Sequence, residues 1–403
     1  MHPKYLSIND YNYILPQEKI AMHPLEERDD SKLLVYSGHE ITEFRFKELP
    51  ELIPQDALLI FNNSKVIPAR LNFQKETGSK IEVFCLEPEN PKTGMETMGS
   101  VIWKCMVGGA SRWKERALEK NVLIEGNLVV LKAELIERSV PFKIRFSWQP
   151  EHYKFHQVLD AAGLVPLPPY IKRELEEKDK QRYQTVYAEK AGSVAAPTAG
   201  LHFTDSVMDK LKARGISMEY LTLHVGSGTF KPVDAEKMEG HQMHAEWIEV
   251  KSSAIEKLIL HRGPIIAVGT TCTRTLETLY WLGAKIMQGV CLKDVGLDQW
   301  DVYEEPLCNT ECERSLSLKA LYEELKKSNT DTLICQTSLL ITPGYSFRVV
   351  DRIITNFHQP KSTLLLLVAA ATGGDWEKIY DYALENEFRF LSYGDSSLID
   401  IST

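Results

Sequence analysis

The sequence of 403 residues lacks the marks of a membrane-spanning, exported or disulfide-stapled chain. Its longest apolar run, TLLLLVAAA at residues 363–371, is far shorter than the roughly 20 residues that cross a bilayer, so it predicts a buried helix. No basic stretch followed by an apolar core opens the chain, which argues against a secretory signal and favours a cytoplasmic location. The seven cysteines are scattered without a C-x-x-C pair, as is typical of reduced thiols.

An excess of positive charge is missing as well. The formal net charge is -9, whereas a broad nucleic-acid-binding surface needs clustered lysines and arginines to contact phosphates. An enzyme that engages a single RNA loop needs only a local basic patch. Such a patch is expected from cationic side chains in or beside the motifs described below: Lys65, Arg70, Lys172, Arg173, Lys231 and Lys361.

The hydrophobic periodicity changes along the chain and predicts two domains. Residues 71–150 contain strand-like runs such as KIEVFCL and NLVVLKAELI without a helical period, which predicts a small all-β domain. Before and after it, in residues 1–70 and 151–403, strand-like and helix-like segments alternate, which predicts an α/β main domain. Residues 283–335 are partly helical and are interpreted as an excursion from that domain.

Local signals place single elements of the main domain. The runs ALLIF (57–61) and PIIAV (264–268) predict buried strands. Thr204 is expected to cap a helix that stops at Gly215. Ser253 and Glu256 are expected to form a capping box for the following helix.

Polar side chains follow the first of these strands. In FNNSKVIPARL (61–71), Asn62 stands at the strand's end, where α/β proteins commonly bind ligands. Lys65 and Arg70 offer cations for a carboxylate or a phosphate. A solvated turn is the structural alternative.

A run of small residues precedes the helix that Thr204 is expected to cap. In AAPTAGLHF (195–203), these residues let the backbone approach a ligand closely. Thr198 and His202 would then supply a hydroxyl and an imidazole. The alternative for His202 is a hydrogen-bonded core histidine.

The segment LHVGSGTFKPV (223–233) contains a tight glycine turn. The turn would bring His224, Ser227 and Thr229 close together after a strand. The segment matches neither G-x-G-x-x-G nor a P-loop, and a simple hairpin turn is its alternative.

The segment EGHQMHAEWIEV (239–250) is the one place where a bound metal is conceivable. It offers His241, His244 and Glu246, but their spacing fits neither H-E-x-x-H nor an EF-hand. In a strand, His244 and Glu246 would face the same side, which equally suits an acid/base pair. We therefore expect no metal.

Two helix starts carry further candidates. In AVGTTCTRTLETL (267–279), Thr270, Thr271 and Arg274 gather where free N–H groups suit an anion or a ribose, and Glu277 is expected to pair with Arg274 on the surface. Before the apolar run at 363–371 stand three polar residues, and a carboxylate follows Gly394; these four candidates are Asn356, His358, Lys361 and Asp395.

These segments together resemble the S-adenosylmethionine:tRNA ribosyltransferase-isomerase family of queuosine biosynthesis. The resemblance covers about residues 10 to 400, through strings that follow one another in family order: PLPPYIKR, RYQTVYA, AAPTAGLHF, HVGSGTFKPV, HQMHAE, VGTTCTRTLE, TNFHQPKSTLL and RFLSYGD. It implies an α/β main domain with a barrel-like mixed sheet and surrounding helices, and a small inserted β-barrel domain. The chain departs from the family between Glu277 and Pro343, where shorter members pass almost directly to the next strand.

The resemblance also implies an activity. The ribosyl moiety of S-adenosylmethionine, a co-substrate rather than a bound cofactor, is transferred to 7-aminomethyl-7-deazaguanine in tRNA and isomerised to give epoxyqueuosine, with release of adenine and methionine. Histidine suits a base of near-neutral pKa for this chemistry. The candidate catalytic residues are His202, His224, His241, His244, Glu246, His358 and Asp395, and the histidines among them are expected to line or support one cleft. The candidate substrate-binding residues are Asn62, Lys65, Arg70, Thr198, Ser227, Thr229, Thr270, Thr271, Arg274, Asn356 and Lys361.

Three other functions stay open at this point. A protein of the same fold could use S-adenosylmethionine on a free deazapurine. A metal-dependent hydrolase could use the group at 241–246, and a non-enzymatic RNA-binding protein would have to reconcile RNA with the negative net charge.

Overall fold

The structure is a computed structural model that describes residues 2–75, 77–90, 94–226 and 233–402. The candidates Ser227, Thr229 and Lys231 therefore lie outside the described residues. No helix among the described residues is long and apolar enough to cross a membrane.

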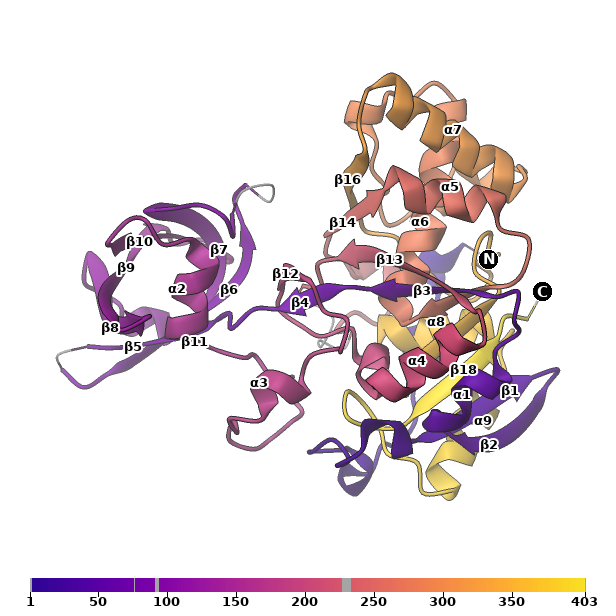
Figure 1. Ribbon diagram of the computed structural model, residues 1–403, viewed down its shortest axis with the longest axis horizontal. Helices are drawn as coiled ribbons and strands as arrows, with labels where there is room; N and C mark the ends of the chain where they lie inside the picture. Colours follow the sequence, from indigo (N-terminus) through magenta and orange to yellow (C-terminus); the bar gives the residue numbers. More distant parts are fainter. Residues whose placement is uncertain (1, 76, 91–93, 227–232, 403) are drawn as a thin grey trace.

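A nine-stranded mixed sheet forms the larger part of the molecule (Figure 1). Its order is β16 (Thr332–Thr337), β14 (Glu246–Lys251), β13 (Ser217–Leu223), β3 (Leu58–Asn62), β15 (Ile265–Val268), β17 (Arg352–Asn356), β18 (Ser396–Asp400), β1 (Lys32–Ser37) and β2 (Glu40–Arg45). The neighbours β13, β3, β15 and β17 are parallel. Their carboxyl ends therefore meet at one edge of the sheet.

Helices cover both faces of this sheet. On β3, Leu58 and Ile60 belong to one hydrophobic cluster, and Leu59 and Phe61 belong to another, because successive side chains of a strand point to opposite faces. The first cluster contains residues of α5 (Ser252–Leu260), α6 (Thr270–Met287), α7 (Arg314–Lys327), α8 (Thr363–Ala371) and α9 (Trp376–Glu385). The second contains residues of α1 (Leu49–Leu52) and α4 (Asp205–Ala213). This double burial explains why the strand is apolar throughout.

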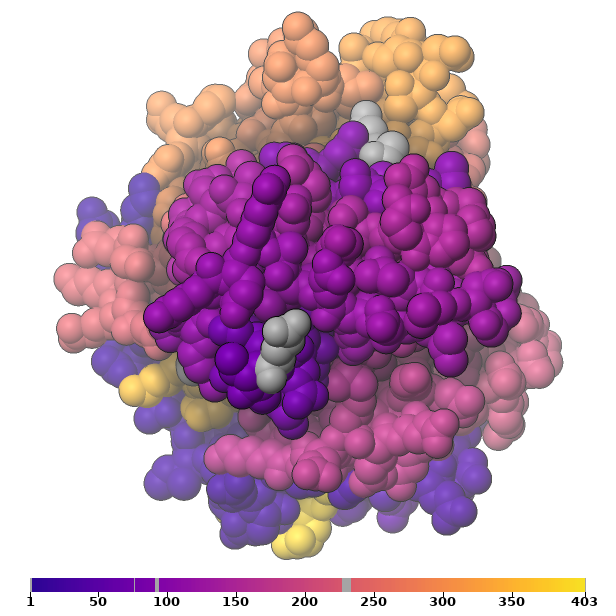
Figure 2. Space-filling view, turned by 90° about the vertical axis from the view of Figure 1, so that its left-hand side faces the viewer, coloured from indigo at the N-terminus to yellow at the C-terminus, as the bar shows by residue number. Residues whose placement is uncertain are grey.

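A second sheet is antiparallel and curled. Its order is β11 (Gly163–Leu164), β5 (Arg70–Gln74), β6 (Lys80–Pro88), β7 (Ser100–Gly108), β10 (Phe142–Gln149), β9 (Asn127–Glu137) and β8 (Ala117–Ile124). Aromatic side chains from β7, β10 and α2 (Phe155–Ala162) pack inside it, among them Trp103, Trp148 and Phe155. Residues of this sheet occupy the centre of the face shown in Figure 2. The chain enters it at Arg70 and leaves it at Leu164, beyond the range 71–150.

A two-stranded ribbon connects the two sheets. β4 (Ser64–Val66) continues from β3 and pairs in parallel with β12 (Lys190–Ser193), which lies on the return path. Between the curled sheet and β12 lies the short helix α3 (Asp179–Arg182). The segment that leaves the large sheet and the segment that returns to it are thus hydrogen-bonded to each other.

Several sequence expectations are confirmed and one is wrong. The buried helix at 363–371 is α8, and the Thr204 hydroxyl accepts a hydrogen bond from the Val207 N–H at 3.2 Å, which caps α4. The capping box of Ser253 and Glu256 is absent from α5. That helix begins at Ser252 without a side-chain cap, and Glu256 instead accepts from the Tyr322 hydroxyl at 2.9 Å.

The region 283–335 is integrated into the main sheet. α6 continues through it to Met287, and α7 packs in the same cluster as α5 and α6. β16 then adds an edge strand by pairing with β14. Part of the acidic charge here is paired, since Lys285 contacts Asp301 at 2.6 Å.

We predict that Gly283→Ala destabilises the protein by about 1–3 kcal/mol through overpacking. A Cβ at Gly283 would lie 2.0 Å from the main-chain oxygen of Ser317, where α6 and α7 touch. Urea unfolding measures the change. Gly296→Ala is the matched control, because its new Cβ would meet no atom closer than 3.6 Å, and equal losses in both variants would contradict the packing argument.

Candidate active site

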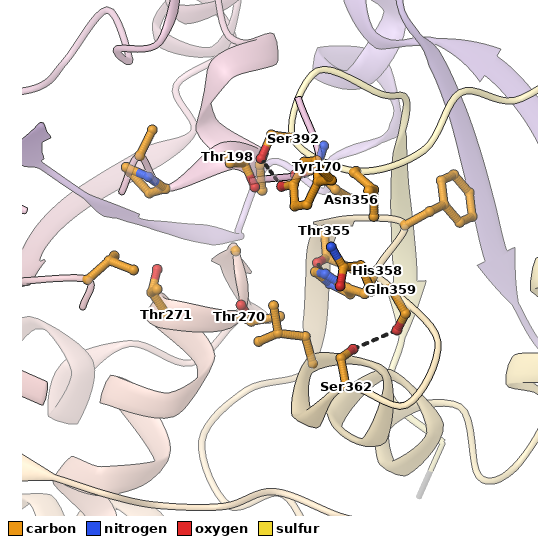
Figure 3. A pocket seen from close by; sticks show the side chains of 18 residues that line it. Tyr170, Thr198, Thr270, Thr271, Thr355, Asn356, His358, Gln359, Ser362 and Ser392 are labelled. Atoms are coloured by element: carbon orange, nitrogen blue, oxygen red, sulfur yellow. Dashed lines mark hydrogen bonds between the residues drawn. The ribbon is translucent and has the colours of Figure 1, made fainter. Parts of the chain in front are cut away.

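A cleft opens at the edge where the parallel strands end (Figure 3). It encloses about 690 Å³ of space between atoms, including its open mouth. Three strands of the parallel set contribute to its lining at or just after their carboxyl ends: Val225 lies two residues after β13, Gly269 follows β15, and Asn356 ends β17. The remaining polar lining comes from Tyr170, Thr198, Thr270, Thr271, Thr355, His358, Gln359, Ser362 and Ser392.

One wall of the cleft is the start of α6. Gly269 joins β15 to the helix with a φ of 95°, a conformation that favours glycine. The first N–H groups of the helix lack intrahelical partners, and Thr270 and Thr271 lie beside them. Asn62 supports this wall, since its side-chain amide contacts the Thr271 hydroxyl at 3.4 Å. Such a helix start suits an anionic group.

The opposite wall is built around Asn356, which is 3% exposed. Its amide nitrogen lies 3.1 Å from Nε2 of His202 and donates more weakly to the main-chain oxygen of Asp395 at 3.5 Å. A carbonyl can only accept, so this contact identifies the nitrogen of the amide. Nε2 of His202 must then accept, and its Nδ1–H donates to the Ser31 hydroxyl at 2.8 Å.

This chain of hydrogen bonds leaves the amide oxygen of Asn356 buried and without a partner among the described residues. A buried acceptor without a donor costs free energy, roughly 1–3 kcal/mol. The arrangement therefore keeps an acceptor available to a ligand that offers a donor.

The two histidines of this wall are neutral. Burial, together with the nearby charge of Arg389, lowers the pKa of His202 to about 3. Burial also lowers the pKa of His358 to about 3. Nε2 of His358 lies 2.9 Å from the Thr355 hydroxyl. The main-chain N–H of His358 donates to the Tyr380 hydroxyl at 2.9 Å.

Arg274 and Glu246 form a buried ion pair beside the cleft. Glu246 also accepts from the Gly226 N–H at 3.1 Å, and Arg274 donates to the Leu339 carbonyl at 3.1 Å. The pair thus holds two backbone segments, one at Gly226 and one at Leu339. Arg274 is inside the first turns of α6, as expected; its Nη1 contacts Glu246, and its buried Nη2 has no hydrogen-bond partner among the described residues.

The expected surface pair of Arg274 and Glu277 is wrong. Glu277 is fully buried and accepts from the main-chain N–H groups of Arg348, Val349 and Val350 at 2.8–3.0 Å. The Tyr345 hydroxyl donates to it at 2.8 Å. Burial raises the pKa of Glu277, and the hydrogen bonds oppose that shift. The carboxylate anchors the loop that leads into β17.

The other histidine candidates are not among the residues that line the cleft in the described part of the chain. His224 lies 3.5 Å from Glu249, and this hydrogen bond lowers the pKa of Glu249. His241 is half-buried, with its pKa lowered by burial and by His244. His244 is exposed and precedes β14, so it shares no strand face with Glu246.

The remaining candidates either stabilise the structure around the cleft or lie outside it. The Asn62 side chain bonds both main-chain groups of Leu223, and Asp395, 2% exposed, accepts from the Lys32 and Arg389 N–H groups. Lys361 donates to the Asn9 side chain at 2.8 Å. Lys65 is exposed, and Arg70 lies 3.8 Å from Glu82 on the curled sheet.

One residue of the expected basic patch, Arg173, forms an ion pair inside the protein. Both Nη atoms of Arg173 donate to the buried carboxylate of Asp179 at 2.7 Å. Lys172, its neighbour, is exposed. Arg173 thus pairs with a carboxylate of the protein, and the basic patch stays a prediction for the other expected residues.

Sequence reasoning missed Tyr170, Ser392 and Ser31. Tyr170 and Ser392 bond to each other across the cleft wall, although 222 residues separate them. Tyr170 lies in the PLPPYIKR string and Ser392 in RFLSYGD, so the strings marked their regions but not their roles. Ser31 has no local signal, because its partner His202 is 171 residues away.

No group of three or more potential metal ligands occurs among the described residues. Glu246, one of the conceivable ligands, is paired with Arg274 instead. The donor set that a metal-dependent hydrolase would need is thus not assembled in this part of the chain.

Comparison with known proteins identifies the class. The model of the family described as queuosine biosynthesis protein matches residues 8–399, and the chain belongs to that family. The S-adenosylmethionine:tRNA ribosyltransferase-isomerase of Treponema denticola is 38% identical, covering 97% of this chain and 99% of that protein. The protein of the same name from Halothermothrix orenii is 37% identical, covering 98% and 100%. The resemblance carried by the motif strings is confirmed, and with it the expectation of an enzyme.

A solved structure extends the comparison. It is the crystal structure of an S-adenosylmethionine tRNA ribosyltransferase from Thermotoga maritima, which is 28% identical to this chain. The match covers 97% of this chain and 99% of that chain, with a TM-score of 0.46.

We predict that His358→Asn makes stability less dependent on pH. The pKa of His358 is about 3 in the fold and 6.5 as the ordinary value, so between these values the unfolded chain binds the extra proton. Stability linked to this residue is complete above pH 6.5 and is lost as pH falls toward 3. Replacing the residue should flatten the slope of unfolding free energy by about 1.4 kcal/mol per pH unit in that range.

Urea unfolding at several pH values measures this slope. His152→Asn, at an exposed position of the chain, is the matched control and should keep the slope of the parent protein. An unchanged slope in His358→Asn would contradict the neutral, buried state of His358.

Proposed function

We propose that the protein is a ribosyltransferase-isomerase that uses S-adenosylmethionine on tRNA. It transfers the ribosyl moiety to the aminomethyl group of 7-aminomethyl-7-deazaguanine and rearranges it to epoxyqueuosine, with release of adenine and methionine. The observation that carries this proposal is the cleft at the strand ends, which lies between the start of α6 and the unpaired buried amide oxygen of Asn356. Membership of the queuosine biosynthesis family supplies the reaction class.

The two walls suit different ends of S-adenosylmethionine. The start of α6, with Thr270 and Thr271, receives the methionyl carboxylate, because partial positive charge gathers at a helix N-terminus. The amide oxygen of Asn356 accepts from a ribosyl hydroxyl on the opposite wall. Thr198 supplies a further hydroxyl contact.

His358 is the residue we assign to proton transfer. It is the histidine that lines the cleft among the described residues, and at neutral pH its imidazole carries no extra proton. The sulfonium of the co-substrate acidifies the neighbouring C5′ hydrogens, and His358, whose lowered pKa makes it a weaker base than the near-neutral histidine expected from the sequence, takes one of them. The resulting imidazolium has a low pKa and gives the proton to the departing adenine, which leaves the histidine neutral again.

His202 acts through Asn356 rather than on the substrate. Its neutral ring accepts from the amide and so fixes the direction of the free oxygen. We therefore assign His202 and Ser31 as positioning residues. Asp395 holds the start of β18 beside them.

We further infer that the curled sheet forms an inserted barrel-like domain and that the main domain comprises the chain before and after it. The acceptor is the modified base in the anticodon loop of tRNA, which places the protein in the cytoplasm. The reaction needs no resident cofactor or metal, since the sulfonium itself activates the ribosyl group.

Incubation of the protein with S-adenosylmethionine tests the function. We expect adenine and methionine to form with tRNA that carries the aminomethyl base, and the modified tRNA to gain the epoxycyclopentanediol mass. The free base is the matched alternative acceptor. Adenine release with the free base alone would show that tRNA is not the substrate.

Isotope exchange tests the role of His358 in the same system. With S-adenosylmethionine tritiated at C5′, the parent protein should release tritium to water, and His358→Asn should lose release by at least about 100-fold, as removal of a general base does. Equilibrium binding of S-adenosylmethionine should change little. Full tritium release by the variant would assign the base to another residue, with His224→Asn as the next variant to measure.

A further inference from the structure

A second, smaller cavity lies next to the cleft and is strongly cationic. Arginines from three separate segments line it: Arg28 near the N-terminus, Arg182 in α3, and Arg389 ahead of β18. The cavity encloses about 270 Å³ between atoms, including its opening. In Figure 1, α3, which carries Arg182, lies between the curled sheet and the large sheet.

The positive charge of this cavity is poorly neutralised. Arg28 donates to the main-chain oxygens of Gln184 at 2.7 Å and Gln181 at 3.0 Å, and Arg182 donates to that of Glu26 at 3.0 Å. Neither guanidinium has a carboxylate within 4.0 Å among the described residues. Their positions are fixed by carbonyls, which carry no net charge.

Arg389 is the exception, with Asp395 at 3.2 Å. That carboxylate already accepts from the main-chain N–H groups of Lys32 and Arg389 at 3.0 and 2.7 Å. Among the described residues, Arg389 is thus the one of the three arginines with a carboxylate partner. Burial and the charge of Arg182 lower the pKa of Arg28, as expected for like charges held together.

The cationic cavity adjoins the cleft. Ser392 lines both spaces. His202 lines the cationic cavity and bonds to Asn356, which lines the cleft. An anion bound by the arginines would therefore sit one residue layer from the co-substrate.

We propose that Arg28, Arg182 and Arg389 bind one backbone phosphate of the tRNA, next to the nucleotide whose base enters the cleft. The inference rests on the proposed function, because it identifies what holds the substrate of that cleft. Guanidinium forks match phosphate oxygens, and the helix start of α6 already accounts for the carboxylate of S-adenosylmethionine. None of these arginines belongs to the basic patch expected from the sequence.

RNA binding at several salt concentrations tests the proposal. The probe is an anticodon stem–loop RNA, titrated into the parent protein, Arg28→Gln and Arg182→Gln. Each variant should bind the RNA at least about 5-fold more weakly, and the slope of log affinity against log salt should flatten by about 0.7 for the lost contact to a single strand. The affinity for S-adenosylmethionine should stay that of the parent.

Arg116→Gln is the matched control, since it removes the same charge at a side chain that is 95% exposed on the curled sheet. Its RNA affinity and salt slope should equal those of the parent. Unchanged RNA affinity and slope in both cavity variants would overturn the proposal. A loss of S-adenosylmethionine affinity with RNA binding intact would overturn it too, and would assign the cavity to the methionyl carboxylate.

A measurement on the parent protein covers the case in which the variants fold poorly. Crystals soaked in tungstate, a heavy analogue of phosphate, should show an anomalous peak within hydrogen-bond distance of the three guanidiniums. Absence of that peak, with tungstate bound elsewhere, would overturn the proposal. Adenine release tests the function separately: release with an unchanged salt slope refutes the cavity alone, and a flattened slope without release refutes the function alone.

Discussion

Parallel pairing of β13, β3, β15 and β17 is the constraint on which the site depends. Because these strands run in the same direction, the segments that follow them emerge at one edge of the sheet. Segments from distant parts of the sequence thus meet there: Val225, the start of α6, and Asn356 with His358. Helices on both faces bury the strands, so the edge is the part of the sheet that remains open to a ligand.

Buried polar contacts then hold each segment in place at that edge. Asn62 ties β3 to β13, Glu246 and Arg274 fix Gly226, and Glu277 binds three successive N–H groups before β17. Such groups contribute little when complete, but removing one partner of a buried pair costs about 3–5 kcal/mol. They therefore specify the shape of the cleft more than they add to stability, and they leave the oxygen of Asn356 available.

The sequence was informative where the signal is local. Apolar runs predicted β3, β15 and α8, and the motif strings predicted Thr198, Thr270, Asn356 and His358, which the cleft brings together. Partners far along the chain left no such signal: Glu277 was assigned to Arg274 by helical spacing, yet its partners lie 68 to 73 residues away. The same holds for Ser31 and His202, and for the three arginines of the second cavity. Long-range pairing depends on topology, which residue spacing does not encode.

The central claim is that the cleft at the strand ends binds S-adenosylmethionine between the start of α6 and Asn356. A crystal structure of the protein with S-adenosylmethionine tests it most directly. The account predicts the methionyl carboxylate at the N–H groups of Thr270 and Thr271, and a ribosyl hydroxyl within hydrogen-bond distance of the amide oxygen of Asn356. Co-substrate bound outside this cleft, or an Asn356 oxygen still without a partner in the complex, would contradict it.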